Sequence, residues 1–218
     1  AGNHAIATAW AARALGLSAR VVMTATAPPI RVERVRALGA EVVLADDVHT
    51  AFSTAEAIVH DEGRTLIHPF EGLTTAIATA GVGREFVDAA PTLDAVIVPV
   101  GGGGLAAGVA TAVKLATPGC RVFGVEPMGA DSMTRSFATG APATLERVDT
   151  IADSLGAPMA LPLSYALCRQ HIDDVVRVSD EALVAAMLSI YEHLALAVEP
   201  ACAAALAALL GPLAETLK

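Results

Sequence analysis

Residues 99–105 have the sequence Pro99-Val100-Gly101-Gly102-Gly103-Gly104-Leu105, which is the most informative stretch of the chain for its fold. It joins an apolar run, Ala95–Val100, to an alanine- and valine-rich stretch, Leu105–Ala116, so we expect a strand, a glycine turn and a helix. Glycines permit positive φ and let backbone amides converge without obstruction by Cβ atoms, while the helix N-terminus adds about half a positive charge. A turn of this kind is suited to binding a phosphate group.

Two other interpretations of this turn stay open at this point. It can be a simple strand-to-helix turn that binds nothing, or a dinucleotide site, because Gly101, Gly103 and Ala106 fit the glycine fingerprint and Glu126 ends the next strand as a candidate ribose ligand. The absence of Gly-Lys-Ser/Thr after the glycines argues against a Walker-type nucleotide loop. A run of four glycines satisfies many patterns, so we prefer a phosphate-bearing cofactor and keep an NAD-dependent oxidoreductase as the alternative.

Working outward from the turn, short β-branched runs alternate with longer helical stretches, which is typical of an α/β fold with parallel sheets covered by helices. The predicted strands are Arg20–Thr24, Glu41–Ala45, Thr65–His68, Ala95–Val100, Arg121–Val125 and Asp174–Val178. The predicted helices are His4–Leu15, Ile30–Leu38, Thr50–His60, Thr74–Ala89, Leu105–Ala116, Leu163–Arg169, Glu181–Leu196 and Ala201–Leu210.

The sequence divides into two predicted domains. The segments Ala14-Leu15-Gly16 and Ala37-Leu38-Gly39 are each followed by a valine pair, which indicates two successive helix-glycine-strand units. We therefore expect a small βα domain over residues 1–66 and a larger βα domain over residues 67–218, packed together without a low-complexity linker.

Composition limits the class of protein. With 54% hydrophobic and 17% charged residues among 218, the chain is neither disordered nor fibrous. The longest charge-free stretch, Ala95–Val113, is interrupted by Pro99 and the glycines, which argues against a membrane helix. A net charge of −9 disfavours nucleic acid as a partner, and three scattered cysteines without a CxxC motif fit a reducing cytoplasm.

Three further groups of residues are candidates for a site. Gly2-Asn3-His4 opens a predicted helix, where Asn3 either caps the helix or helps to hold an anion or a cofactor oxygen. Glu199 stands between two apolar helices, as a helix-start charge or as a buried acid facing a site.

The third group is Glu126-Pro127 with Ala130, Asp131 and Ser132, at the carboxyl end of a strand, where open α/β sheets bind their ligands. Carboxylates and a loop carbonyl can hold a hard cation there, although solvated loop acids are commoner. No GxSxG or HExxH motif is present.

In chain order, these motifs resemble the threonine/serine dehydratase (threonine ammonia-lyase) and serine racemase branch of the fold-type II pyridoxal-phosphate enzymes. The resemblance covers nearly the whole chain and rests on Gly2-Asn3-His4, residues 34–43 (RVRALGAEVV), His68-Pro69-Phe70, residues 98–105 (VPVGGGGL), Val125-Glu126-Pro127, Thr150-Ile151-Ala152-Asp153 and Val198-Glu199-Pro200. It implies two parallel-sheet βα domains of the tryptophan synthase β-subunit type.

The resemblance also implies roles for single residues. Gly101–Gly104 would hold the phosphate of pyridoxal 5'-phosphate, and Asn3 would donate a hydrogen bond to the 3-hydroxyl of its ring. The amides around Gly2, Asn3 and His4 would bind the substrate carboxylate, and Glu199 would lie near the imine side of the cofactor.

In some relatives a divalent cation lies where Glu126 and the Ala130 carbonyl fall in this chain, together with an acid two residues further on. That position is Ser132 here, a departure that counts against the cation.

The lysine that binds the cofactor as a Schiff base is a larger departure. The family places it upstream of the Gly-Asn-His segment, and neither Lys114 nor Lys218, the two lysines of this chain, is a credible substitute. We therefore expect an internal fragment that is incomplete at both ends and inactive in isolation.

For the complete enzyme, the resemblance implies β-elimination from threonine or serine to a 2-oxo acid and ammonia. Serine racemisation is the first alternative, and a non-catalytic, ligand-sensing relative is another. We further expect an amino-acid substrate, a homo-oligomer, no nucleic-acid or membrane partner, and a cytoplasmic location. Which β-hydroxy amino acid is preferred does not follow from the motifs.

Overall fold

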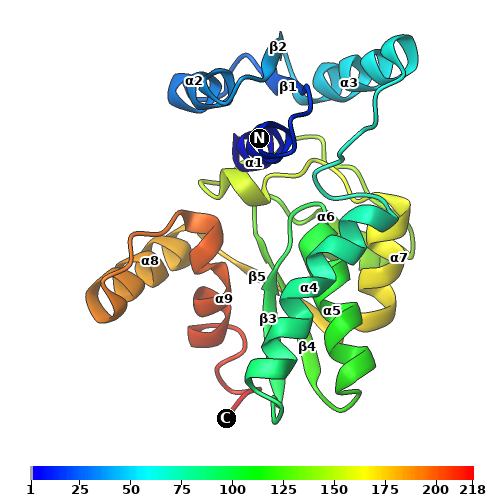
Figure 1. Ribbon diagram of the computed structural model, residues 1–218. Helices are drawn as coiled ribbons and strands as arrows, with labels where there is room; N and C mark the ends of the chain where they lie inside the picture. The colour runs from blue at the N-terminus through cyan, green and yellow to red at the C-terminus, as the bar shows by residue number, and fades with distance from the viewer. Residues whose placement is uncertain (1) are drawn as a thin grey trace. The chain divides into compact units, whose positions relative to one another are not determined.

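The computed structural model describes residues 2–218, which form two compact units. One unit ends at Ile67 and the other covers His68–Lys218. Each is built of parallel strands and helices, as the alternation of apolar runs predicts (Figure 1).

The first unit holds a two-stranded parallel sheet with three helices. Its elements are α1 (Gly2–Ala14), β1 (Arg20–Thr24), α2 (Pro29–Ala37), β2 (Glu41–Ala45) and α3 (Val48–Glu62). In the sheet, Arg20 lies opposite Glu41, and Val35 of α2 is fully buried in the core beneath it. Gly16 and Gly39 have φ of 68° and 88° and end α1 and α2, as predicted.

The second unit holds a three-stranded parallel sheet in the order β3-β4-β5. Its elements are α4 (Leu73–Ala89), β3 (Ala95–Pro99), α5 (Gly104–Ala116), β4 (Arg121–Pro127), α6 (Ser132–Thr139), the 3-10 turn η1 (Asp153–Leu155), α7 (Pro162–His171), β5 (Asp174–Val178), α8 (Asp180–Leu194) and α9 (Pro200–Leu210).

Both faces of this sheet are covered by helices (Figure 1). Val96 and Val98 of β3 pack with α5 and α7, while Ile97 between them packs on the opposite side with α8 and α9. This alternation follows from the two-residue period of a strand, and burial on both faces explains why the strand is apolar throughout. The carboxyl ends of the three strands lie at one edge of the sheet, where the candidate site is found.

Helices α4 and α5 approach each other closely because glycines lie between them. A Cβ atom added at Gly83 would lie 2.7 Å from the carbonyl oxygen of Val109, and one at Gly108 would lie 2.5 Å from that of Ala76. This contact sets α4 against α5, the helix that begins at the glycine turn.

Three sequence expectations about local structure are wrong. Thr65–His68 forms no strand and pairs with neither strand of the first unit's sheet, and Ile67 is half exposed. Asn3 lies inside α1 rather than at its N-cap, because the helix already includes Gly2. Helix α6 and the 3-10 turn η1 lie in a stretch where no element is predicted.

The remaining predicted strands and all the predicted helices are present, with ends that differ by at most a few residues. Across residues 2–218, none of the helices combines the length and the apolar character needed to span a membrane.

Candidate functional site

The glycine turn joins the end of β3 to the first residue of α5. Gly103 occupies the N-cap position in the left-handed region, with φ of 90°, and it offers the helix no side-chain cap. The conformation requires a glycine there, since other L-residues are strained at this φ.

The other glycines are required by close packing. A Cβ atom on Gly102 would overlap the ring of Phe70, and one on Gly104 would lie 2.5 Å from the Cα atom of Phe70. At Gly101, a Cβ atom would lie 3.1 Å from the Cα atom of Leu155. Packing therefore explains part of the glycine run without any ligand.

Packing does not explain why the backbone amides of the turn lack hydrogen-bond acceptors. Within residues 2–218, the amides of Gly101–Gly104 have no protein acceptor, although Gly102, Gly103 and Gly104 are buried. The turn's carbonyl groups are engaged: Thr79 Oγ1 donates to the oxygen of Gly104 at 2.9 Å, and Cys168 Sγ donates to that of Gly103 at 3.6 Å. Buried amides without acceptors are rare in proteins, so the turn is suited to an anionic group supplied by a ligand.

The segment beneath the turn is held by Glu71. Its carboxylate accepts hydrogen bonds from the amides of Leu163 at 2.8 Å and Ser164 at 3.0 Å, at the start of α7. The ring of His68 meets that of Phe70 edge to face at 4.7 Å. These contacts fix Phe70 against the glycines.

Cys168 contributes packing and a weak hydrogen bond rather than a nucleophile. Burial, and secondly the charge of Glu126, raises the pKa of its thiol to about 12, so the thiol stays protonated at neutral pH.

Glu199 lies on the opposite side of the same sheet edge, at the N-cap of α9. Its side chain makes no capping bond with α9, and Oε1 instead accepts a hydrogen bond from Ser154 Oγ at 2.8 Å. Ser154 belongs to η1, whose next residue, Leu155, packs against Gly101. The structure thus brings Glu199 and the glycine turn together through η1, a link that sequence reasoning missed.

Gly2, Asn3 and His4 belong to the first unit and lie in the first turn of α1. His4 Nε2 donates a hydrogen bond to the carbonyl oxygen of Ile67 at 2.8 Å, and a Cβ atom on Gly2 would overlap the side chain of Arg31. Asn3 is exposed. Their predicted contacts with cofactor and substrate stay predictions.

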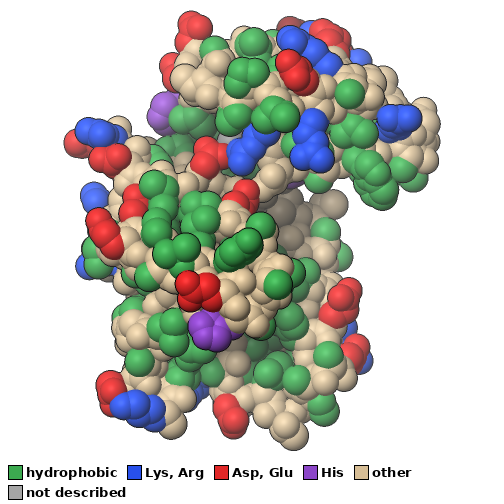
Figure 2. Space-filling view, turned by 90° about the vertical axis from the view of Figure 1, so that its left-hand side faces the viewer, with side chains coloured by type: hydrophobic (Ala, Val, Ile, Leu, Met, Phe, Trp, Pro, Cys, Tyr) green, Lys and Arg blue, Asp and Glu red, His purple; other side chains and the backbone are tan. Residues whose placement is uncertain are grey.

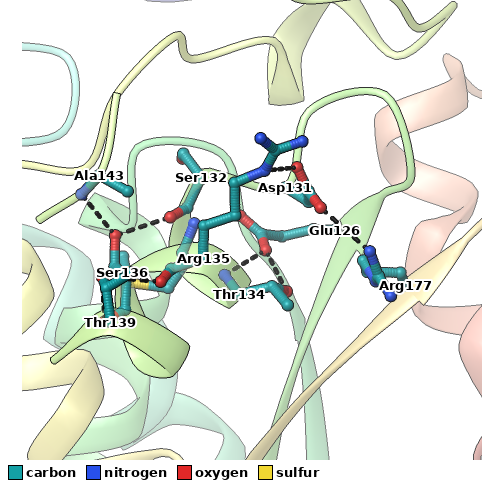
Figure 3. A network of polar contacts seen from close by, with 10 residues as sticks. Glu126, Asp131, Ser132, Thr134, Arg135, Ser136, Thr139, Ala143 and Arg177 are labelled. Carbon is teal, nitrogen blue, oxygen red and sulfur yellow. Dashed lines mark hydrogen bonds and ion pairs between the residues drawn. The ribbon is translucent and has the colours of Figure 1, made fainter. Parts of the chain in front are cut away.

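Glu126, at the end of β4, has a structural role that the sequence did not reveal. It is fully buried, and Oε1 accepts from the amide of Met133 at 2.8 Å, while Oε2 accepts from the amide of Thr134 at 2.8 Å and from its hydroxyl at 2.6 Å (Figure 3). Its carboxyl group therefore caps the N-terminus of α6 from a neighbouring strand.

Burial raises the pKa of Glu126 to about 7, because the charged form loses its hydration. The hydrogen bonds from Thr134 and Met133 act in the opposite direction, and the nearby charge of Asp131 adds to the increase. Asp131 itself is paired with two cations, Arg135 at 2.8 Å and Arg177 at 3.1 Å (Figure 3).

These contacts leave few donors for a divalent cation. Both oxygens of Glu126 are engaged, and besides the Ala130 carbonyl only the Ser132 hydroxyl is left, buried and without a partner in the described chain. Hard cations take six or more oxygen ligands, so this donor set does not fit one. Residues 2–218 also contain no group of three or more His, Cys, Asp or Glu side chains placed to hold a metal ion. The predicted cation site stays a prediction, and the function proposed below does not depend on it.

Because Glu126 is buried, the interpretation of this residue as the ribose ligand of a dinucleotide is wrong. A ribose ligand needs a carboxylate that faces the ligand, whereas this one faces the interior and the start of α6.

Both lysines pair with acids away from the glycine turn. Lys114 lies in the last turn of α5, with Nζ 2.8 Å from Asp173 Oδ2, and Lys218 pairs with Glu215.

Known proteins match the chain over its whole length. The family model described as pyridoxal-phosphate dependent enzyme matches residues 1–218. A phenylserine dehydratase from Ralstonia pickettii is 54% identical over 217 residues, which are 100% of this chain and 67% of that protein.

Two solved structures are similar as well. Maize serine racemase has a TM-score of 0.92 at 38% identity, covering 96% of this chain and 64% of that one. The threonine deaminase of T.th. has a TM-score of 0.92 at 37% identity, covering 99% and 71%. The chain therefore spans about two thirds of the length of these proteins.

Proposed function

This chain belongs to the family of pyridoxal-phosphate dependent enzymes, and from this premise we propose that the protein converts a β-hydroxy amino acid to a 2-oxo acid and ammonia. In that reaction the substrate loses its Cα proton and its β-hydroxyl group as water, and a later hydrolysis consumes one water. The observation that carries the proposal is the set of unpaired amides at the turn between β3 and α5.

The residues of the turn fit the cofactor's phosphate. Four consecutive glycines have no side chains that could block their amides, and the dipole of α5 favours an anion at its first turn. When bound, pyridoxal phosphate supplies an electron sink for the pair released from the Cα–H bond. The chain's own share is to hold the phosphate at Gly101–Gly104 and to place the reacting group between the turn and Glu199.

We assign the remaining roles as the resemblance implies. Asn3 would hold the ring hydroxyl, and the amides of the Gly2-Asn3-His4 segment would hold the substrate carboxylate. We also propose that the two compact units are the small domain and part of the larger, cofactor-binding domain.

The proposed substrates are threonine and serine, together with phenylserine. Phenylserine is included because the similar Ralstonia pickettii protein is a phenylserine dehydratase, with 54% identity over the chain. All three carry the hydroxyl group on Cβ that the reaction removes.

The test uses the complete enzyme rather than this chain alone, and measures 2-oxo acid and ammonia from each of the three amino acids, with pyridoxal phosphate present and absent. We expect equal amounts of both products, formed only with the cofactor. Tight NAD binding without any response to pyridoxal phosphate would overturn the proposal.

Racemisation is the second candidate, because the maize serine racemase structure is so similar. Chiral analysis of serine from the same reactions separates the two. Accumulation of D-serine without 2-oxo acid would assign racemisation instead of elimination.

We also propose that the protein is a homo-oligomer. In the second unit, Val184, Leu188 and Tyr191 of α8 are 45, 57 and 63% exposed, and apolar side chains gather on the face that this helix presents (Figure 2). Large exposed apolar patches are typical of interaction sites. Leu188→Glu should lower the molar mass measured by light scattering. An unchanged mass would exclude the exposed apolar face of α8 as the contact between subunits.

A further inference from the structure

The hydrogen bond between Ser154 and Glu199 joins two segments that are far apart in the chain. The partners are 45 residues apart, and Ser154 Oγ lies 2.8 Å from Glu199 Oε1. As the N-cap of α9, Glu199 could bond to the first amides of its own helix, yet its side chain makes no such bond. The carboxylate is thus directed toward η1.

The segment that holds Ser154 is hydrogen-bonded within itself and lies against the glycine turn. The amide of Leu155 donates to the carbonyl oxygen of Ala152 at 2.8 Å, and Ala152 is fully buried. The backbone of Leu155 is in turn so close to Gly101 that a Cβ atom there would be 3.1 Å away. Ser154 is therefore fixed relative to the first glycine of the turn.

The helix that holds Glu199 is attached to the same sheet. Ala203, Ala204 and Ala208 of α9 are completely buried in the core cluster that includes Ile97 of β3. Since β3 leads directly into the glycine turn, α9 and η1 approach the turn from the same face of the sheet. The Ser154–Glu199 bond joins η1 to the start of α9.

We propose that Ser154 is a positioning residue, which holds the Glu199 carboxylate in one orientation beside the reacting group. The inference rests on the proposed function, because it matters only if Glu199 faces the bound cofactor. A hydroxyl-to-carboxylate hydrogen bond is charge-assisted, and it restricts a glutamate side chain that otherwise has several rotamers. Because Ser154 is exposed, removing the bond should alter catalysis far more than folding.

The test uses a double-mutant cycle in the holoenzyme, with Ser154→Ala, Glu199→Ala and the double variant, and with Ser154→Thr as the conservative control. We expect Ser154→Ala to lower kcat about 10-fold, with the cofactor dissociation constant and the melting temperature unchanged. Ser154→Thr, which keeps the hydroxyl, should retain kcat within about 3-fold of the original enzyme. The double variant should be no slower than Glu199→Ala alone, because Ser154 acts through Glu199.

Two results would overturn the inference while leaving the proposed function intact. One is an unchanged kcat in Ser154→Ala. The other is an equal loss from Ser154→Ala with and without Glu199, which would mean that the serine acts independently. A holoenzyme that turns over none of the β-hydroxy amino acids would instead refute the proposed function and this inference with it.

Discussion

The turns after β3 and β4 lie at the carboxyl ends of neighbouring strands, yet they satisfy the helices that follow them in opposite ways. After β4, the amides that begin α6 receive the carboxyl group of Glu126, from the strand itself. After β3, the turn that begins α5 consists of glycines, and its amides have no acceptor within residues 2–218. A helix start that holds its own acid is closed to other anions, whereas one without any acid is open to a ligand's phosphate.

The largest expected effect comes from removing the carboxyl group of Glu126 from the turn after β4, which we call the closed turn. Glu126→Ala should lower the free energy of unfolding by about 4 kcal/mol at about pH 4.5, where the contribution of this group is largest, since it leaves the amides of Met133 and Thr134 without an acceptor. Urea unfolding followed by circular dichroism measures this loss. A loss below about 1 kcal/mol would mean that water replaces the carboxylate, and the contrast between the turns would disappear.

The pH dependence of stability sharpens the same contrast. The folded-state pKa of Glu126, about 7, lies above its ordinary value of 4.5, so between these values the folded protein binds this proton more strongly than the unfolded chain. The contribution of Glu126 to the free energy of unfolding is therefore complete below about pH 4.5. It is lost as the pH rises through 7, a change of about 3 kcal/mol.

Urea unfolding of the wild-type protein and of Glu126→Gln across this pH range isolates the effect. We expect the free energy of unfolding of the wild-type protein to fall relative to that of Glu126→Gln as the pH rises from about 4.5 through 7. Parallel stability curves would contradict the raised pKa.

A side chain introduced into the open turn after β3, Gly101–Gly104, should reduce the affinity for the cofactor. Gly103→Ala forces an alanine into φ of 90° and places its Cβ atom 2.6 Å from Met133 Cε, so the amides should lose their alignment. We expect the dissociation constant of pyridoxal phosphate to increase about 100-fold.

Gly119→Ala is the matched control, because no atom lies within 4 Å of the added Cβ atom. Fluorescence titration should give this variant the wild-type affinity. If Gly103→Ala also binds normally, the turn does not hold the cofactor.

The smallest effect concerns α4, which supports the open turn through Thr79. Gly81 is open to solvent in this helix, so Gly81→Ala should stabilise the protein by about 0.7 kcal/mol without changing cofactor affinity. Gly83→Ala, two residues away, should instead destabilise by about 2 kcal/mol, since its Cβ atom would meet Val109 of α5. Thermal melts compare the two, and equal effects would contradict the close α4–α5 packing.

Local patterns predicted much of this architecture. The α/β fold class, the family and the position of the glycine turn are confirmed. They were predictable because apolar runs, caps and glycines act over a few residues. Ser179, for example, is a residue type preferred at the N-cap, and it caps α8 by accepting from the amide of Ala182 at 3.2 Å.

Features that depend on distant contacts were not predictable. Helix α6 begins where Glu126 of the preceding strand caps it, and a glutamate at the end of a strand gives no sign of whether it faces solvent or a helix. The Ser154–Glu199 bond joins partners 45 residues apart, and no local signal marks it. Thr65–His68 shows the opposite error, since a short apolar run forms a strand only when another strand pairs with it.

The most direct test of the open turn follows the amide NMR signals of Gly101–Gly104 while pyridoxal phosphate, and separately pyridoxal without phosphate, is added. We expect these four signals to move with pyridoxal phosphate and to stay in place with pyridoxal. Signals that remain unmoved while pyridoxal phosphate binds elsewhere in the protein would contradict it.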